Sequence, residues 1–342
     1  MHKQVRIEYL ERYIPKNVQL FFLTPKKNNK YKLKRTKIIE IPGEKINFTL
    51  KLRKFCRINK IDLLVNFGTS NESFGMFFAI FGAKTKYIIN EIGDIWNILK
   101  LEKSLLKRFF LFFRNIALII PFIFAKRIIY PSSDICNQNK KIFFFIKNKM
   151  KQIPLIIDEK IFFHKDKTKT RKKLKLPLKR DIILYVGRIF YLKGSDILLD
   201  LIKKNPDKLF ILIGNVIDKH YQKLKLPNLL LIPSADLKEL VNYYNSADLF
   251  IFPSRIEAYG LVHREAMLCE TPVLVSDIPA LRLTEHALKA KPNFEDMQKE
   301  IDKFFSMSKD KRKKLGRISR KYVIKENSYK NLKNKKKELL LN

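Results

Sequence analysis

The second half of the chain alternates short apolar runs with stretches of helical periodicity. The apolar runs predict five buried parallel strands, at Asp181–Val186, Lys208–Ile213, Asn228–Ile232, Asp248–Phe252 and Pro272–Ser276. Helices are expected after the first four strands, at Gly194–Lys204, Lys219–Lys223, Ala235–Ser246 and Leu261–Cys269. Repeated β-α units of this kind predict an open, doubly wound α/β sheet. Ligands of such sheets bind beyond the carboxyl ends of the strands, so the loops there are the candidate site.

The first half shows a weaker form of the same pattern. Strands are predicted at Val18–Leu23, Lys37–Ile41, Ile61–Asn66, Thr85–Ile89 and Arg127–Tyr130. Helices are predicted at the N-terminus, at Ser73–Phe81, and over Leu99–Phe124 with a break near Pro121. The lysine-rich segment 164–180 has no apolar periodicity, which is typical of a solvated linker. The expected organisation is therefore a domain at 1–163, a basic linker at 164–180, a second domain at 181–308 and a basic helical tail at 309–342.

The most apolar segment is Phe109–Ala125, and it contains Arg114 and Pro121. It is shorter than the roughly 20 apolar residues that a spanning helix needs, and an arginine inside the bilayer is costly. Lysines and arginines flank it, which favours a helix lying in the headgroup region of an anionic leaflet. The alternative is a buried core helix of the first domain. The N-terminus has no apolar signal-peptide region, so we expect a cytoplasmic protein held peripherally on the inner face of the membrane.

Composition narrows the function classes. The formal net charge is +38, yet 46% of the 342 residues are hydrophobic, which excludes a disordered polybasic chain. The charge is open to three interpretations: nucleic-acid binding, an anionic membrane surface, or a compositional bias. Lysine exceeds arginine, which argues against specific nucleic-acid recognition. Three widely spaced cysteines exclude a disulfide scaffold, and the five histidines lack paired ligand spacing, so no metal site is expected.

Two loops after predicted strands carry candidate chemistry. After the first strand of the second half come Gly187-Arg188 and then Lys193-Gly194. Glycines that allow close backbone approach, together with two cations, suit a diphosphate, although a lysine at a helix start is ordinary in so basic a chain.

After the fourth strand, Glu257 and Glu265 lie eight residues apart. Free N–H groups where the helix begins, near Gly260, Leu261 and Val262, could hold a phosphate or sugar oxygen. A carboxylate suits the vicinal hydroxyls of a sugar, and a chance spacing is the alternative.

These motifs resemble family 4 glycosyltransferases of the GT-B fold. The resemblance rests on LYVGRIFYLKG, on YYNSADLFIFPS and on EAYGLVHREAM, which occur in the family's order. The first half resembles the family more faintly, at IDLLVNFGTS and KQIPLIIDEKIFF. The resemblance implies two Rossmann-like doubly wound domains that face a central cleft. It also implies transfer of a hexose, with retention, from a nucleotide sugar to a hydroxyl of a lipid-linked or surface glycan, with no metal or other cofactor.

The resemblance also implies roles by position. Arg188 and Lys193, on the turn at Gly187, would bind the donor diphosphate and stabilise the leaving nucleoside diphosphate. Glu265 would hold the ribose hydroxyls, and Glu257 would contact the transferred sugar. Backbone N–H groups would assist at Tyr259, Gly260, Leu261 and Val262. His263 is expected to pack or to line the cleft.

Several positions depart from the family pattern. No glycine precedes Gly43, so either the N-terminal domain lacks its first strand and Gly-rich turn or the chain starts late. Glu270 stands where the family has glycine. Glu91 or Asp94 would replace the acceptor-side histidine, with helix capping as the alternative for Asp94. Trp96 is expected to pack, with sugar stacking as the alternative.

These departures from the family pattern motivate a second hypothesis, that the protein is a catalytically inactive GT-B partner or a glycan-binding subunit. The net charge alone motivates a third hypothesis, polyanion binding.

Overall fold

The computed structural model describes residues 11, 14–24, 34–41, 45–66, 70–90, 94–102, 104–221 and 224–341. The chain forms two compact units. Unit 1 contains Met1–Ile156 and Tyr329–Asn342, and unit 2 contains Ile157–Ser328. The chain therefore leaves unit 1, builds all of unit 2, and then returns to unit 1. The N-terminal helix expected from the sequence lies outside the described residues.

Unit 2 is built on a six-stranded parallel sheet with the order β12-β11-β10-β7-β8-β9. Its strands are β7 (Ile182–Val186), β8 (Leu209–Ile213), β9 (Leu229–Ile232), β10 (Leu249–Phe252), β11 (Val273–Ser276) and β12 (Leu288–Ala290). The first five confirm the strands predicted from apolar runs. Strands β7 and β10 are neighbours, although two β-α units separate them along the chain. The strand order reverses between them, and in such sheets this switch point is where ligands bind.

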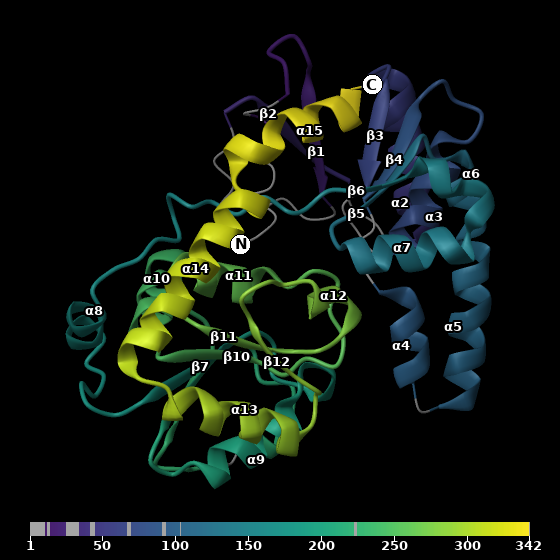
Figure 1. Ribbon diagram of the computed structural model, residues 1–342. Coiled ribbons are helices and arrows are strands. Elements are labelled where there is room, and N and C mark those ends of the chain that lie inside the picture. The colour runs from purple at the N-terminus through teal and green to yellow at the C-terminus, as the bar shows by residue number, and fades with distance from the viewer. Residues whose placement is uncertain are drawn as a thin grey trace. The chain divides into compact units, whose positions relative to one another are not determined.

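Helices cover both faces of this sheet, with α9 and α13 on one face and α10, α11 and α14 on the other (Figure 1). The helical segments are α8 (Lys167–Lys173), η2 (Tyr191–Lys193), α9 (Ser195–Lys204), η3 (Lys219–Tyr221), α10 (Leu237–Ser246), α11 (Leu261–Leu268), α12 (Pro279–Arg282), α13 (Phe294–Ser306) and α14 (Lys309–Asn327). Strands β7, β8, β10 and β11 are buried at every position. This two-sided burial explains why they appear as continuous apolar runs.

The segment expected to be a linker, 164–180, is instead part of unit 2. Asp166 caps α8, and the buried Arg171 donates to the carbonyl of Ser246 at 2.9 Å and pairs with Asp248 at 2.6 Å. The exposed side of α8 consists mostly of lysines, so the sequence shows no apolar periodicity there. The helix is held in unit 2 by the buried Arg171 and not by an apolar face. The domain bounds consequently differ from the expected 1–163 and 181–308.

Unit 1 contains two parallel sheets among its described residues. Strands β3 (Leu63–Asn66), β4 (Lys86–Asn90), β5 (Arg127–Tyr130) and β6 (Met150–Gln152) form one sheet in that order. Strands β1 (Leu20–Thr24) and β2 (Thr36–Glu40) pair separately. Five of these strands were predicted, and the short β6 was not. Residues 25–33, where a turn after β1 would lie, are outside the described chain.

The helices of unit 1 are α2 (Lys45–Ile58), α3 (Ser70–Ile80), α4 (Ile95–Leu101), α5 (Leu105–Ala117), α6 (Ile119–Phe124), α7 (Ser133–Ile142), η1 (Phe144–Lys149) and α15 (Tyr329–Leu341). The predicted break in the apolar region falls at Leu118 and not at Pro121. Pro121 sits in the first turn of α6, where a missing N–H costs nothing. No helix among the described residues has the length and apolarity needed to cross a bilayer.

Helix α15 completes the core of unit 1. Leu332 lies in one buried cluster with Ile14, Ile88, Ile129 and Ile153. The basic tail expected at 309–342 is thus helical, as predicted, but it is divided between the two units at Ser328.

Candidate active site

The loops that follow β7 and β10 are in direct contact in unit 2. Gly194, at the end of η2, has a φ of 77°, and a Cβ at this position would lie 2.3 Å from the carbonyl oxygen of Pro253. Only glycine allows this approach, which explains why a glycine follows Lys193. The two loops are further joined because the Arg255 amide donates to the carbonyl of Leu192 at 3.0 Å.

Gly194→Ala is expected to destabilise unit 2 by about 2–4 kcal/mol, because it adds a steric clash to an unfavourable left-handed backbone. Gly82→Ala is the matched control, since Gly82 has a φ of 75° but its Cβ would meet nothing within 4 Å. Denaturant unfolding measures both variants. Equal losses of stability in the two variants would contradict the proposed contact with Pro253.

Lys193 and Glu257 meet at this junction. The Lys193 ammonium donates to the Glu257 carboxylate and, at 2.9 Å, to the carbonyl of Ile256. Both side chains are mostly buried. An ammonium has three N–H donors, so two are used here and the third can serve a phosphate oxygen. The structure therefore brings together two residues that the sequence assigned separately to the diphosphate and the sugar.

Arg188 follows the same strand and is exposed. Its guanidinium lies over the Phe190 ring, and its carbonyl accepts from the Tyr185 hydroxyl at 2.8 Å. The Gly187 amide donates to the carbonyl of Ile213, and a Cβ on Gly214 would lie 2.0 Å from the Gly187 carbonyl oxygen. Two glycines thus hold the ends of β7 and β8 together and leave Arg188 facing solvent, where a ligand can reach it.

Helix α11 begins beside Glu257 without a side-chain cap. Gly260 is its N-cap, with a φ of 69°, and no side chain bonds the first amides. Tyr259 and Gly260 are buried, and Leu261 and Val262 are half-buried. Uncapped N–H groups at a helix start attract anions. The backbone groups predicted to assist the donor are therefore placed together at one helix end.

Glu265 is not exposed at this surface. Its side chain is buried and accepts from the Tyr244 hydroxyl at 2.8 Å. Burial raises the pKa of its carboxyl from 4.5 to about 7, against the opposing effect of the Tyr244 bond. The predicted role of Glu265 toward a ribose therefore stays a prediction.

This pKa gives a pH dependence of stability. A folded-state pKa above the unfolded value means that the unfolded chain binds fewer protons between pH 4.5 and about 7. Stability therefore falls as pH rises through this range, by roughly 3 kcal/mol for a shift of this size. Glu265→Gln keeps the Tyr244 acceptor and is expected to remove this contribution. Urea unfolding at pH 5 and pH 8 compares the two proteins, and parallel pH profiles would contradict the assignment.

Two arginines that the sequence did not single out organise the site. The Arg255 guanidinium forms a double ion pair with Asp196, with both N···O distances at 2.7 Å, and donates to the carbonyl of Tyr191. It therefore clamps the loop after β10 onto η2 and α9. No short motif in the sequence signals this pair, because the partners lie 59 residues apart.

The second is Arg264, buried under the start of α11. Its guanidinium donates to the carbonyls of Tyr259 at 2.6 Å and Gly260 at 3.0 Å, and stacks on the Tyr259 ring. Burial, and then the charge of Arg264, lower the pKa of His263 well below its usual range, so this ring is neutral. His263 is fully buried, so the expectation that it packs is confirmed. Arg264 thus binds the carbonyls that precede α11 and fixes the loop where the helix begins.

The loop is also tied to the place where the chain leaves unit 2. The side-chain amide of Asn327 donates to the Tyr259 hydroxyl at 2.6 Å. The backbone carbonyl of Asn327 accepts from the backbone amide of Ile157 at 3.0 Å. Ile157 is the first residue of unit 2 and Asn327 the last but one, so one asparagine joins both ends of the unit to the loop before α11.

The acceptor-side candidates lie in unit 1. Asp94 caps α4, because its carboxylate accepts from the amide of Asn97 at 3.1 Å, which supports the capping alternative. Trp96 donates to Asn139 at 3.3 Å and contacts Phe143, so it packs as expected. Glu91 lies outside the described residues.

Comparison with known proteins identifies the region that carries this site. Residues 166–322 match the model of the glycosyl transferases group 1 family. The segment is therefore similar to group 1 glycosyl transferases. The match begins at α8, in agreement with the assignment of that helix to unit 2.

The chain also resembles curated relatives over part of its length. A D-inositol 3-phosphate glycosyltransferase from Xylanimonas cellulosilytica is 30% identical over 127 residues, which is 34% of this chain and 30% of that protein. The chain spans about a third of the length of the curated relatives it matches.

Solved structures extend the likeness beyond the segment 166–322. Sucrose-phosphate synthase from Thermosynechococcus elongatus superposes with a TM-score of 0.81 at 18% identity, covering 97% of this chain and 90% of that one. HepE from Anabaena, in complex with UDP and glucose, gives 0.72 at 16% identity, covering 90% and 86%. The expected fold class is confirmed: the chain has the GT-B fold, built from Rossmann-like units.

One departure from the family pattern, at Glu270, lies in a left-handed turn of unit 2. Glu270 has a φ of 60°, the left-handed conformation that glycine would adopt more easily. Its carbonyl faces Gly316 of α14, where a Cβ would lie 2.0 Å from that oxygen. Gly316 therefore allows α14 to approach this turn, but it does not relieve the left-handed φ of Glu270.

Proposed function

We propose that the protein transfers a hexose from a nucleotide-sugar donor to a hydroxyl of a lipid-linked or surface glycan, with retention of configuration. The observation that carries the proposal is the contact of Lys193 with Glu257 at the switch point of the unit 2 sheet. It joins the loop that carries Arg188 to the loop that leads into the uncapped start of α11. The complex of HepE with UDP-glucose supports a nucleotide sugar as the donor.

The site suits a leaving group that gains charge. When the bond between the sugar and the diphosphate breaks, negative charge grows on the diphosphate oxygens. Arg188, the third N–H of Lys193 and the amides at the start of α11 are the donors that would stabilise it. Because the contacts with Glu257 and Ile256 hold the Lys193 ammonium before a nucleotide sugar binds, this group needs little reorganisation during the reaction.

Glu257 is suited to hold the sugar and not to attack it. Its ion pair with Lys193 lowers the nucleophilicity of the carboxylate and leaves an oxygen that can accept from sugar hydroxyls. We therefore assign Glu257 to the transferred hexose, and the ribose to Glu265, whose burial requires a local rearrangement to expose its carboxylate.

A panel of UDP-, GDP- and ADP-sugars tests the proposal. The purified full chain is expected to release nucleoside diphosphate from at least one donor, and that donor should raise the melting temperature. NMR of the product reports the anomeric configuration. A chain that binds no donor would overturn the proposal in favour of an inactive GT-B subunit, and an inverted product would overturn retention.

Chelation gives a separate expected result. Since Arg188 and Lys193 supply two positive charges at the diphosphate site, transfer is expected to continue in EDTA with kcat changed by less than about twofold. The measurement is nucleoside diphosphate release with and without EDTA, and with added Mg²⁺. A strong loss that Mg²⁺ restores would assign the neutralising charge to a metal.

A further inference from the structure

Helix α5 turns its apolar side outward. Asn115 is its buried residue, and its amide donates to the carbonyl of Ile95 at 2.9 Å. Leu105, Phe109 and Phe113, spaced four residues apart, are all more than half exposed. A helix on a globular surface normally places its apolar stripe against the core. The expected alternative of a buried core helix is therefore wrong for α5, although Pro121 and Phe122 of α6 are buried.

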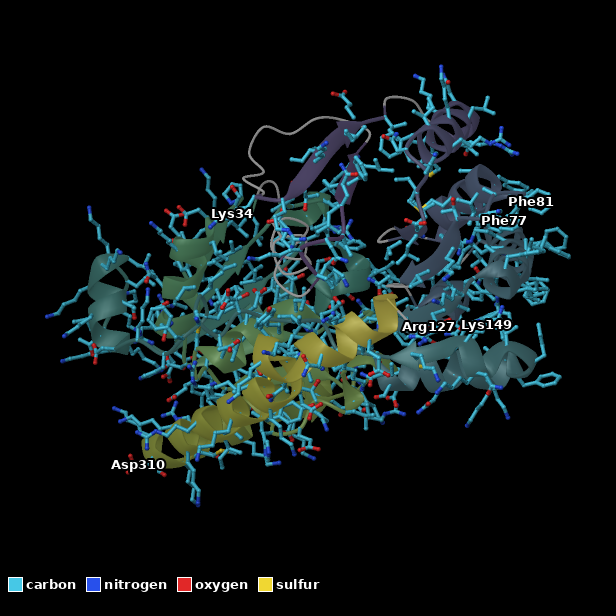
Figure 2. The ribbon with its side chains drawn as sticks, turned by 90° about the horizontal axis from the view of Figure 1, so that it is seen from above. Lys34, Phe77, Phe81, Arg127, Lys149 and Asp310 are labelled. Atoms are coloured by element: carbon cyan, nitrogen blue, oxygen red, sulfur yellow. The ribbon has the colours of Figure 1, made fainter. Side chains whose placement is uncertain are left out.

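Other elements of unit 1 extend this exposed apolar area. Phe124 of α6 contacts Phe77 and Phe81 at the end of α3, with ring centroids 5.1 and 6.2 Å apart. Lys149 of η1 donates to the carbonyl of Ile123, which places η1 beside α6. Phe77, Phe81 and Lys149 are labelled in Figure 2. We call the exposed apolar side chains of α5, α6, η1 and the end of α3 the phenylalanine face.

The phenylalanine face is unusually apolar for a protein surface. It holds 14 of the 23 large hydrophobic side chains that are exposed among the described residues. Phe144 and Phe145 of η1 belong to it and are 68% and 54% exposed. A large contiguous apolar patch on a soluble domain marks a binding surface.

The charges on this surface are of one sign. The sequences of α5, α6 and η1 contain no Asp or Glu, but they carry Lys107, Arg108, Arg114, Lys147 and Lys149. At the N-terminal ends of β4 and β5, burial and then the charges of Lys86 and Arg127 lower the pKa of Lys126, so cations also lie close together there. An apolar surface whose ionisable side chains are all positively charged complements an anionic lipid headgroup layer.

The dimensions indicate contact with one leaflet. Helix α5 has 13 residues and is therefore about 20 Å long, against about 30 Å for the hydrocarbon core of a bilayer. Phenylalanine rings and leucines on the outer side of a helix of this length can enter the boundary between headgroups and acyl chains while the cations stay at the headgroups.

We propose that the phenylalanine face docks unit 1 on an anionic lipid bilayer. The surface combines α5 and α6 with α3 and η1, which the sequence pattern did not connect to them. The proposal concerns lipid contact in unit 1 and is independent of the donor chemistry proposed for unit 2, although a docked unit 1 would suit a lipid-linked acceptor.

Vesicle flotation with the full chain tests the proposal. Vesicles of phosphatidylcholine alone are compared with vesicles that contain phosphatidylglycerol, at low and high salt. We expect binding to the anionic vesicles that weakens with salt. The triple variant Phe109→Ser, Phe110→Ser, Phe113→Ser is expected to bind at least about tenfold more weakly, because three exposed apolar side chains are lost. Lys107→Gln with Arg108→Gln is expected to reduce binding to the anionic vesicles only.

The matched control removes equally exposed apolar side chains from unit 2. Leu178, Ile217 and Leu283 are 49%, 48% and 54% exposed, and their joint change to serine is expected to leave binding unchanged. Equal binding by the phenylalanine variant and wild type would overturn the proposal, and so would equal binding to neutral vesicles. Sedimentation without lipid adds a third arm: a dimer abolished by the phenylalanine variant would identify a second copy as the occupant instead. Donor-dependent nucleoside diphosphate release, measured without lipid, reports separately on the sugar-transfer proposal.

Discussion

Lys193→Met is expected to lower kcat/KM for sugar transfer by about 100- to 1,000-fold, the usual cost of losing one preorganised donor to a developing charge. The ammonium is held by Glu257 and by the carbonyl of Ile256, so it needs no reorganisation to meet a diphosphate. Methionine keeps most of the apolar stem and removes only the charge. Nucleoside diphosphate release by wild type and variant gives the ratio.

The control for this prediction is Lys204→Met, an exposed lysine in the last turn of α9 in the same unit. It is expected to leave kcat/KM unchanged. Because Lys193→Met leaves the mostly buried Glu257 without its cation, the double variant with Glu257→Gln should recover stability without recovering activity. If the double variant recovered activity, Lys193 would be a structural partner of Glu257 and would have no direct role at the diphosphate.

Arg264→Met is expected to destabilise unit 2 by about 2–4 kcal/mol, because one buried carbonyl loses its donor and a second keeps only the backbone amide that begins the helix. Those carbonyls belong to Tyr259 and Gly260, at the start of α11. The same change should weaken donor binding, since the loop that leads into the uncapped start of α11 would no longer be held in place. Urea unfolding and the donor-induced shift in melting temperature measure the two effects.

Arg317→Met, an exposed arginine on α14, is the matched control and is expected to change stability by less than about 0.5 kcal/mol. Arg264→Lys keeps the charge but cannot reach both carbonyls at once, so it should fall between wild type and Arg264→Met. Full stability in the lysine variant would show that charge alone is required at this position and that the two hydrogen bonds are not.

The sequence predicted most of the strands but missed several helices, among them α2, α7, α8 and α13. Strands such as β7 and β8 are buried on both sides and appear as unbroken apolar runs, so their positions were correct. Helix α8 was missed because seven residues carry five Lys or Arg, and only Thr170 and Arg171 are buried. Short edge strands such as β6 and β12 have too few residues to set a period.

The spacing of residues in the sequence identified the members of the candidate site only where they lie close together in the chain. Lys193 and Glu257 were identified separately, but their contact depends on the β7–β10 adjacency, which no local pattern encodes. Arg255 and Asn327 bind partners far away in the sequence, so no short sequence motif indicates their roles. The burial of Glu265 was also unexpected, since a carboxylate in a motif is normally imagined at a surface.

The return of the chain to unit 1 has a consequence for synthesis. Leu332 packs with Ile14 and Ile88, yet the ribosome makes all of unit 2 between them. Unit 2 can therefore fold as soon as it emerges, since chains fold domain by domain during translation. Unit 1 must keep its apolar surfaces apart, or covered by chaperones, until α15 arrives. Unit 1 is thus the first unit whose synthesis begins and the second whose fold is completed.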